Sequence, residues 1–426
     1  MSKDPGALDS PLRDALVVAA LLVCTNGPVM YLAWHVLQGV PTWEDPAVRG
    51  IFTVTAAVSV LAVLLDSQRV SGRRLKVPSL VGGVSVGTFT AVIVASSFWS
   101  VDPSATRERS LSYVGLAALA WIIADLDFAR FRRALAVTVA LALAGSLVAV
   151  VLSTSIGRDL NGDWRGLFGD PNELGSLAAL GLLVGVPALL ATGGRDRVLP
   201  VSLGVMGLAA LAGSGSLSAW LGLLGAVVCA SLLWFASVGR LRFGSSAVHY
   251  ASAVAALGAA ATAVVAAAVW NSSTLALRRG LWEFGWEGIV ERPIAGYGWF
   301  TVWDSIDLIG AGELWAIGSV HNSILGVWLG GGLLALIPFV AVGATALWGS
   351  GQALWRDPSA DSWTFFALVV FLVAVNLTLS YVLLFSYNWV LLMGAALRPT
   401  GSTQQARPLH PAGGAHGEGA AQPLEP

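Results

Sequence analysis

Residues 277–300 read LRRGLWEFGWEGIVERPIAGYGWF, and residues 319–334 read SVHNSILGVWLGGGLL, where a His-Asn pair opens a long apolar run. This stretch decides the fold, because an apolar run that follows a polar, Trp-rich loop predicts a helix that enters a membrane. Ionisable groups are costly near lipid. A His and a pair of Arg at such a surface therefore predict a functional site.

The whole chain has the composition of a polytopic membrane protein. Its 426 residues are 56% hydrophobic and only 12% charged, with a mean hydropathy of +0.73. One water-soluble core cannot bury that much apolar surface. The formal net charge of -1 argues against a basic nucleic-acid-binding face, so we expect membrane lipids and no nucleic acid among the partners. Cys24 and Cys229 lie in apolar runs and are expected to be packing residues.

About twelve apolar runs are long enough to cross a bilayer, which predicts an all-α integral membrane fold. The last two runs share a short stretch, so about eleven crossings is the alternative. The predicted membrane domain covers residues 15–397, between a polar N-terminus at 1–14 and a disordered tail at 398–426. The runs begin near Ala15, Gly50, Ser79, Leu111, Arg133, Asn172, Val198, Ser216, His249, His321, Trp363 and Tyr381.

Lys and Arg are unevenly distributed between the predicted connections. Most of them fall in the two termini and in the connections that would lie on the same side as the termini. Because short cytoplasmic loops are enriched in these residues, we expect both termini to be cytoplasmic. The loops at 157–171, 212–215 and 271–320 then face outward, and the large third loop joins the ninth predicted helix to the tenth.

The first outward loop ends in DPNE at residues 170–173, the signature of a helix start with Asp170 as the N-cap. A helix N-terminus offers backbone N–H groups that suit a phosphate. Arg158 and Arg165 just upstream are candidates to bind the same anion, or else they pair with nearby carboxylates. Asn172 is a candidate ligand contact or a simple helix cap.

In the third loop, Arg279, Trp282 and Trp286 recur at helical spacing, which predicts one face of a helix along the membrane surface. The tryptophans either stack on sugar rings or form an interfacial aromatic belt.

His321 is a candidate general base, because its ring titrates near ambient pH, and the alternative is a helix-end residue without catalytic role. Asn322 is a candidate to orient it.

No other catalytic pattern stands out. The sequence has neither metal-ligand spacing nor a nucleotide-binding loop, so we expect no metal and no cofactor. Asp304, Asp307 and Glu313 are rival candidates for the base. The residues favour transfer from a donor with a phosphate leaving group, because Arg side chains stabilise the charge that develops on the phosphate as it leaves.

A transporter is the hypothesis of another class, yet apart from Asn376 the predicted helices hold few central polar groups.

At these residues the chain resembles the O-antigen ligase and polymerase superfamily of polytopic membrane glycosyltransferases. The similarity runs from about Gly157 to Ala341. His321 precedes Gly332 by ten intervening residues, the spacing that the ligases show. The other matching motifs are WRGLFGDPN at 164–172, Arg279-x-x-Trp282 followed by ERPIAGYG at 291–298, and His321-Asn322 itself.

The resemblance implies a GT-C-like fold and an inverting, metal-independent transfer of a glycan from an undecaprenyl-pyrophosphate carrier. The acceptor would be a hydroxyl group of an envelope lipid, polymer or protein at the outer face of the cytoplasmic, or inner, membrane. A polymerase that extends one lipid-linked glycan with another is the alternative. The family roles fall on Arg279, which would bind the pyrophosphate, and on His321, which would be the catalytic base.

One position departs from the family pattern. In the second outward loop the ligases have Ser-Arg followed three residues later by Leu, and here Leu217 stands where that Arg would be. We expect Arg165 or Arg278 to supply the missing phosphate contact. A different donor, or a catalytically degenerate binding protein, is the alternative.

Overall fold

Most of the residues that the computed structural model describes are helical. The described part forms no β-strand, and its one isolated β-bridge joins Arg158 to Trp164. The prediction of an all-α fold is therefore confirmed for this part of the chain. The described residues are 10–25, 50, 54–55, 57, 79–152, 154–243, 273–299, 301, 320–379 and 386–398.

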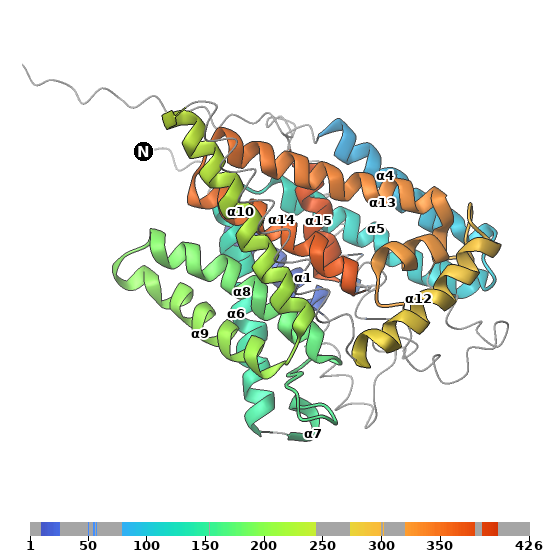
Figure 1. Cartoon of the computed structure of the whole chain (residues 1–426), viewed down its shortest axis with the longest axis horizontal. Coiled ribbons are helices and arrows are strands. Elements are labelled where there is room, and N and C mark those ends of the chain that lie inside the picture. The colour runs from blue at the N-terminus through green and yellow to red at the C-terminus, as the bar shows by residue number, and fades with distance from the viewer. Residues whose placement is uncertain are drawn as a thin grey trace, which may run out of the picture.

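Several helices begin at a side chain that accepts a hydrogen bond from the first turn. Ser79, Asp102, Ser359 and Ser386 do so for the helices that begin at the next residue. In chain order the helices are α1 (Ser10–Cys24), α4 (Leu80–Ala95), η3 (Ser96–Phe98), α5 (Pro103–Asp125), α6 (Phe128–Leu152), α7 (Thr154–Gly157), α8 (Pro171–Ala191), η4 (Gly194–Arg197), α9 (Val198–Gly213), α10 (Leu217–Phe243), α12 (Ser273–Glu291), α13 (Ser323–Arg356), α14 (Ala360–Thr378) and α15 (Tyr387–Leu397) (Figure 1).

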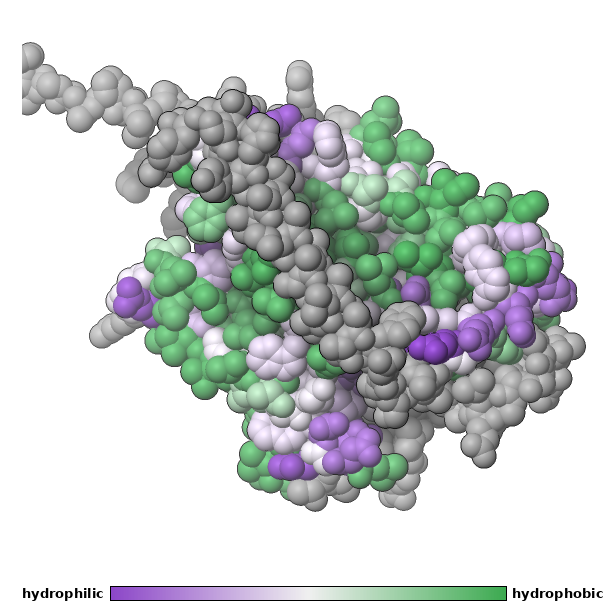
Figure 2. All heavy atoms as spheres, in the orientation of Figure 1, coloured by the Kyte–Doolittle hydropathy of each residue, from purple (hydrophilic) through white to green (hydrophobic). Residues whose placement is uncertain are grey.

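Six of the described helices are long and apolar enough to cross a membrane: α4 with η3, α6, α8, α10, α13 and α14. Hydrophobic side chains cover much of the visible surface of the bundle, whereas hydrophilic ones gather at α12 and beside α7 (Figure 2). A water-soluble protein does not expose so much apolar surface over so many long helices. The fold is that of a membrane-embedded protein.

The predicted count of about twelve crossings stays a prediction. The run from His249 lies outside the described residues, and so does most of the run from Gly50. Helix α9 begins at Val198 as predicted but has 16 residues, and α15 has 11. At about 1.5 Å per residue, both are shorter than the roughly 30 Å hydrocarbon core. The expected disordered tail also lies outside the described residues, apart from Arg398.

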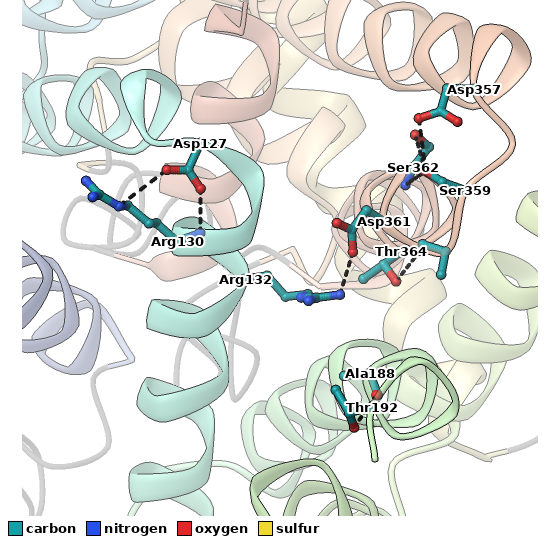
Figure 3. Close-up of polar contacts among 11 residues, drawn as sticks. Asp127, Arg130, Arg132, Ala188, Thr192, Asp357, Ser359, Asp361, Ser362 and Thr364 are labelled. Atoms are coloured by element: carbon teal, nitrogen blue, oxygen red, sulfur yellow. Dashed lines mark hydrogen bonds and ion pairs between the residues drawn. The ribbon is translucent and has the colours of Figure 1, made fainter. Parts of the chain in front are cut away.

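The long helices alternate in direction, which gives the bundle two ends. At the first, called the Arg132 end, Arg132 of α6 forms an ion pair with Asp361 of α14 (Figure 3). At the second, called the His321 end, the Ser216 hydroxyl donates to Asn172 Oδ1 at 2.9 Å and joins α10 to α8. Parts of the first and second outward loops thus lie at the same end as His321, and the side of the membrane that each end faces stays a prediction.

Helix α15 lies in the middle of the bundle (Figure 1), and all 11 of its residues are buried. It packs against α4, α5, α13 and α14. Its Trp389 ring lies 4.9 Å from that of Phe89 and 5.3 Å from that of Phe339, between centroids. Phe89 also meets Trp299, in the loop after α12, edge to face at 5.5 Å. The aromatic cluster therefore attaches this loop to the core.

Helix α13 is interrupted at Gly332, whose φ of 64° and ψ of -166° are not helical. A Cβ atom on Gly332 would lie 2.0 Å from the Ile294 carbonyl oxygen, so only glycine fits. The interruption frees backbone groups that must find partners away from water. Residues 293–298, the core of the ERPIAGYG motif, supply them. The bonds run from Tyr297 N to Leu329 O at 3.0 Å, Gly298 N to Gly330 O at 2.9 Å, Leu333 N to Pro293 O at 2.9 Å and Leu334 N to Ile294 O at 3.2 Å.

Candidate functional site

His321 occupies a turn directly before α13. With a φ of 48°, it is the one non-glycine residue with a positive φ in the described part of the chain. Such a conformation persists only where the surrounding structure imposes it, and it is common at functional sites. Asn322 follows as the N-cap of α13, and its Oδ1 accepts from Ile324 N at 2.9 Å and Leu325 N at 3.1 Å. The structure thus gives Asn322 a capping role that fixes the turn.

Both residues that flank this His-Asn pair are tied to other helices. Trp282 Nε1 on α12 donates to the Val320 carbonyl oxygen at 3.0 Å. The Ser323 hydroxyl lies 2.7 Å from Asn376 Oδ1 and 2.9 Å from the Leu379 carbonyl oxygen, both of which are acceptors for its proton. Asn376, the polar residue that stands out in the predicted spans, therefore holds the turn in place.

His321 lies between opposite charges. Burial lowers the pKa of its imidazole below the usual value, the Arg278 guanidinium on α12 lowers it further, and the Asp170 carboxylate raises it. A cation and an anion from two distant segments therefore both act on the ring. An imidazole with a lowered pKa is uncharged at neutral pH and can accept a proton.

Helix α8 begins where the sequence predicts. Asp170 Oδ1 accepts from Asn172 N at 2.7 Å and from Asn172 Nδ2 at 2.9 Å. The Asn172 side chain also accepts from Ser216, so it joins the first outward loop to the second. The Asp170 carboxylate already accepts a hydrogen bond from the N-terminus of α8, whose backbone N–H groups were expected to bind a phosphate. The arginines are therefore the better anion ligands at this end of the bundle.

The arginines of the first loop pack differently. Arg165 Nε donates to the Ile156 carbonyl oxygen at 2.9 Å. Arg158 lies over the Trp164 ring, with its Cζ atom 5.7 Å from the centroid. The backbone N–H of Trp164 donates to the Gly213 carbonyl oxygen at 2.8 Å. The first and second loops thus fold onto each other and carry both arginines to the His321 end.

Helix α12 presents two arginines in different environments. Arg278 is partly buried and acts on His321, whereas Arg279 is exposed. Trp282 is partly buried. Trp286 is exposed, and its ring meets that of Trp328 edge to face, with 5.7 Å between the centroids. The helix that carries Arg279, Trp282 and Trp286 agrees with the prediction. The charge that reaches His321 comes from Arg278, although the resemblance points to Arg279.

Leu217 is the first residue of α10 and is 43% exposed. It follows Ser216, whose hydroxyl binds Asn172, so the position lies at the His321 end. An arginine at this position would therefore not have to be buried.

Nothing in the sequence indicates that Asp170 approaches His321, because its capping signature predicts only the local turn. Within the described residues, no group of three or more side chains of metal-binding type comes together. The rival bases Asp304, Asp307 and Glu313 lie outside the described residues.

The chain matches no protein-family model, and no curated protein matches it significantly. The fold and the site define its class: a helical, membrane-embedded protein with a charged cluster at one end of an apolar bundle.

Proposed function

We propose that this protein is an O-antigen ligase-like glycosyltransferase that moves a glycan from an undecaprenyl-pyrophosphate carrier to a hydroxyl group of a cell-envelope acceptor. One observation carries the proposal: His321, Arg278 and Asp170 come from separate segments and interact at one end of an apolar bundle. A neutral base beside a cation suits a substrate with a hydroxyl acceptor and a phosphate leaving group. Apolar helices around the site suit its lipid anchor.

The proposed step forms a bond between the acceptor oxygen and the anomeric carbon of the donor sugar. The bond between that carbon and the pyrophosphate oxygen breaks, and the carrier departs as undecaprenyl pyrophosphate with the bonding electrons. His321 takes the proton of the acceptor hydroxyl. Attack from the face opposite the leaving group inverts the anomeric centre.

The charges around His321 fit this step. The Arg278 guanidinium offers charge-assisted hydrogen bonds to the departing pyrophosphate, and it helps to keep the imidazole neutral beforehand. The Asp170 carboxylate stabilises the imidazolium that forms as the proton is transferred. Arg165 reaches the same end of the bundle and is the proposed second phosphate ligand in place of the family arginine at Leu217.

The test is glycan transfer by the purified full-length protein in nanodiscs, with an undecaprenyl-pyrophosphate-linked glycan as donor and cell-envelope material as acceptor. We expect metal-independent release of the carrier by the wild type. The variant His321→Ala should lose transfer by about two to four decades, the usual contribution of a general base. Arg278→Gln should lose about one to two decades, as expected for one charge-assisted contact to the leaving group.

Arg130→Gln is the matched control, because Arg130 lies at the Arg132 end and pairs with Asp127 across a half-exposed contact of 3.4 Å (Figure 3). Surface pairs of this kind contribute little, so this variant should transfer like the wild type. The attachment point of the product separates a ligase from a polymerase. Donor binding without release of the carrier by the wild type would contradict the proposal and favour a degenerate binding protein.

A further inference from the structure

One arginine at the Arg132 end of the bundle lacks the carboxylate partner that its neighbours have. Arg130 pairs with Asp127, and Arg132 pairs with Asp361 (Figure 3). Arg240, near the end of α10, is exposed, and it forms no ion pair within the described residues. Its positive charge is therefore not neutralised by ion pairing within this part of the chain.

The Arg240 side chain is nevertheless held in place by the end of α13. Its Cζ atom lies over the Trp355 ring, 4.6 Å from the centroid, and its Nη2 atom donates to the Trp355 carbonyl oxygen at 3.4 Å. The stacked guanidinium lies beside the backbone of Arg356, the next residue, which is also exposed. Stacking on an indole leaves most of the guanidinium N–H groups available, which suits the binding of a phosphate.

Two more tryptophans fix the surroundings of Arg240. Trp234 Nε1 on α10 donates to the Pro358 carbonyl oxygen at 2.8 Å, in the turn between α13 and α14. Trp363 Nε1 on α14 donates to the Ser231 hydroxyl oxygen on α10 at 3.3 Å. These bonds join α10 to the turn after α13, so the two arginines are brought together by the fold before any ligand binds.

One carboxylate adjoins the pair. Asp357 follows Arg356, and its Oδ2 atom accepts from the Ser359 hydroxyl at 3.2 Å, in the turn before α14 (Figure 3). It offsets one of the two positive charges at most. The ends of α10 and α13 therefore keep a net positive charge, to which an anion is attracted.

Both arginines lie where a membrane-crossing helix meets the head groups of the lipids. The apolar spans of α10 and α13 end at Arg240 and at Arg356. Phe235 on α10 is 62% exposed and Trp348 on α13 is 68% exposed. At about 1.5 Å per residue, these rings come roughly 8 and 12 Å before the arginine of the same helix. A ligand at this position can thus place a charge at the arginines and apolar chains along the helices.

These features select an anionic phospholipid. Its phosphodiester oxygens accept charge-assisted hydrogen bonds from guanidinium groups, and basic pockets between membrane helices bind such head groups. We propose that Arg240 and Arg356 bind the head-group phosphate of an anionic phospholipid such as phosphatidylglycerol. The site lies at the opposite end of the bundle from His321, so it does not depend on the function proposed above.

The test is lipid binding by the purified full-length protein in detergent, followed by native mass spectrometry during titration with phosphatidylglycerol or with phosphatidylcholine. The wild type should bind phosphatidylglycerol at least about tenfold more tightly. Arg240→Gln and Arg356→Gln should each weaken its binding by about tenfold, as expected for one charge-assisted contact. Arg240→Lys keeps the charge but loses the planar stacked group, so its loss should be smaller. Binding of phosphatidylcholine should be unchanged.

Arg130→Gln is the matched control, because Arg130 is an exposed arginine at the same end that already pairs with Asp127. It should bind phosphatidylglycerol like the wild type, and all variants should unfold at the wild-type temperature in phosphatidylcholine. Wild-type affinity in Arg240→Gln would overturn the proposal, as would an equal loss in Arg130→Gln. Displacement of the lipid by inorganic phosphate, but not by potassium chloride at the same ionic strength, would assign the site to a free anion instead.

Discussion

The indole nitrogen of Trp282 donates to the carbonyl oxygen of Val320 at 3.0 Å, and this bond attaches α12 to the residue directly before His321. The same helix carries Arg278 toward the imidazole. One tryptophan therefore joins the His321 turn to the helix that carries Arg278. The aromatic residue does this through a backbone contact, independently of any sugar that the loop binds.

Trp282→Phe should keep the packing of the ring and lose this bond. We expect the rate constant of glycan transfer to fall by about tenfold with little change in the Michaelis constant, because the base is displaced while the lipid contacts remain. Trp286→Phe is the control, since the Trp286 side chain is 51% exposed. Steady-state transfer kinetics measure the difference, and equal rates in the two variants would contradict the role given to Trp282.

Asp170→Asn should change the pH dependence of transfer without loss of the α8 cap, because asparagine caps a helix as well as aspartate does. The Asp170 charge raises the pKa of His321, so its removal lowers that pKa. The active form of the base is the deprotonated one. The acid limb of the pH–rate profile should therefore move to lower pH, with a lower maximal rate.

Arg278→Gln should move the same acid limb in the opposite direction. The Arg278 charge lowers the pKa of His321, and without it the imidazole stays protonated to higher pH. Transfer rates measured across the pH range for both variants give the two shifts. Shifts of the same sign would show that His321 is not the titrating base.

Gly332→Ala should destabilise the protein by at least about 3 kcal/mol, because it adds a side chain at a left-handed position and against the Ile294 carbonyl group. Gly343→Ala in the same helix meets nothing within 4 Å. It should stabilise α13 by up to about 1 kcal/mol through helix propensity. Thermal unfolding in detergent compares the two, and similar unfolding temperatures would contradict the fit of residues 293–298 into the interruption.

Leu217→Arg should strengthen binding of undecaprenyl pyrophosphate. The position is exposed at the His321 end, so the new charge needs no burial. One added charge-assisted contact corresponds to about tenfold in affinity. Leu217→Gln is the uncharged control of similar size. Equal affinity in the two variants would mean that Leu217 lies away from the bound pyrophosphate.

The sequence alone predicted the features that depend on neighbouring residues. Apolar runs predicted the long helices, because the free energy of burying a segment in lipid depends on its own composition. The DPNE signature predicted the start of α8, because a helix cap acts within one helical turn. His321 was placed correctly at the entrance of α13 for the same reason.

Only the tertiary structure decided which residues meet. The sequence favoured Arg279 on the resemblance, and the rotation of α12 against the bundle brought Arg278 to His321. The sequence predicted that Asp170 caps α8, and the packing of α8 also lets its charge act on His321. Nothing in the sequence singles out Arg240, whose stacking on Trp355 is recognisable only once the packing of α10 against α13 is known. Burial and electrostatic interaction depend on distances between segments far apart in the chain, and packing sets those distances.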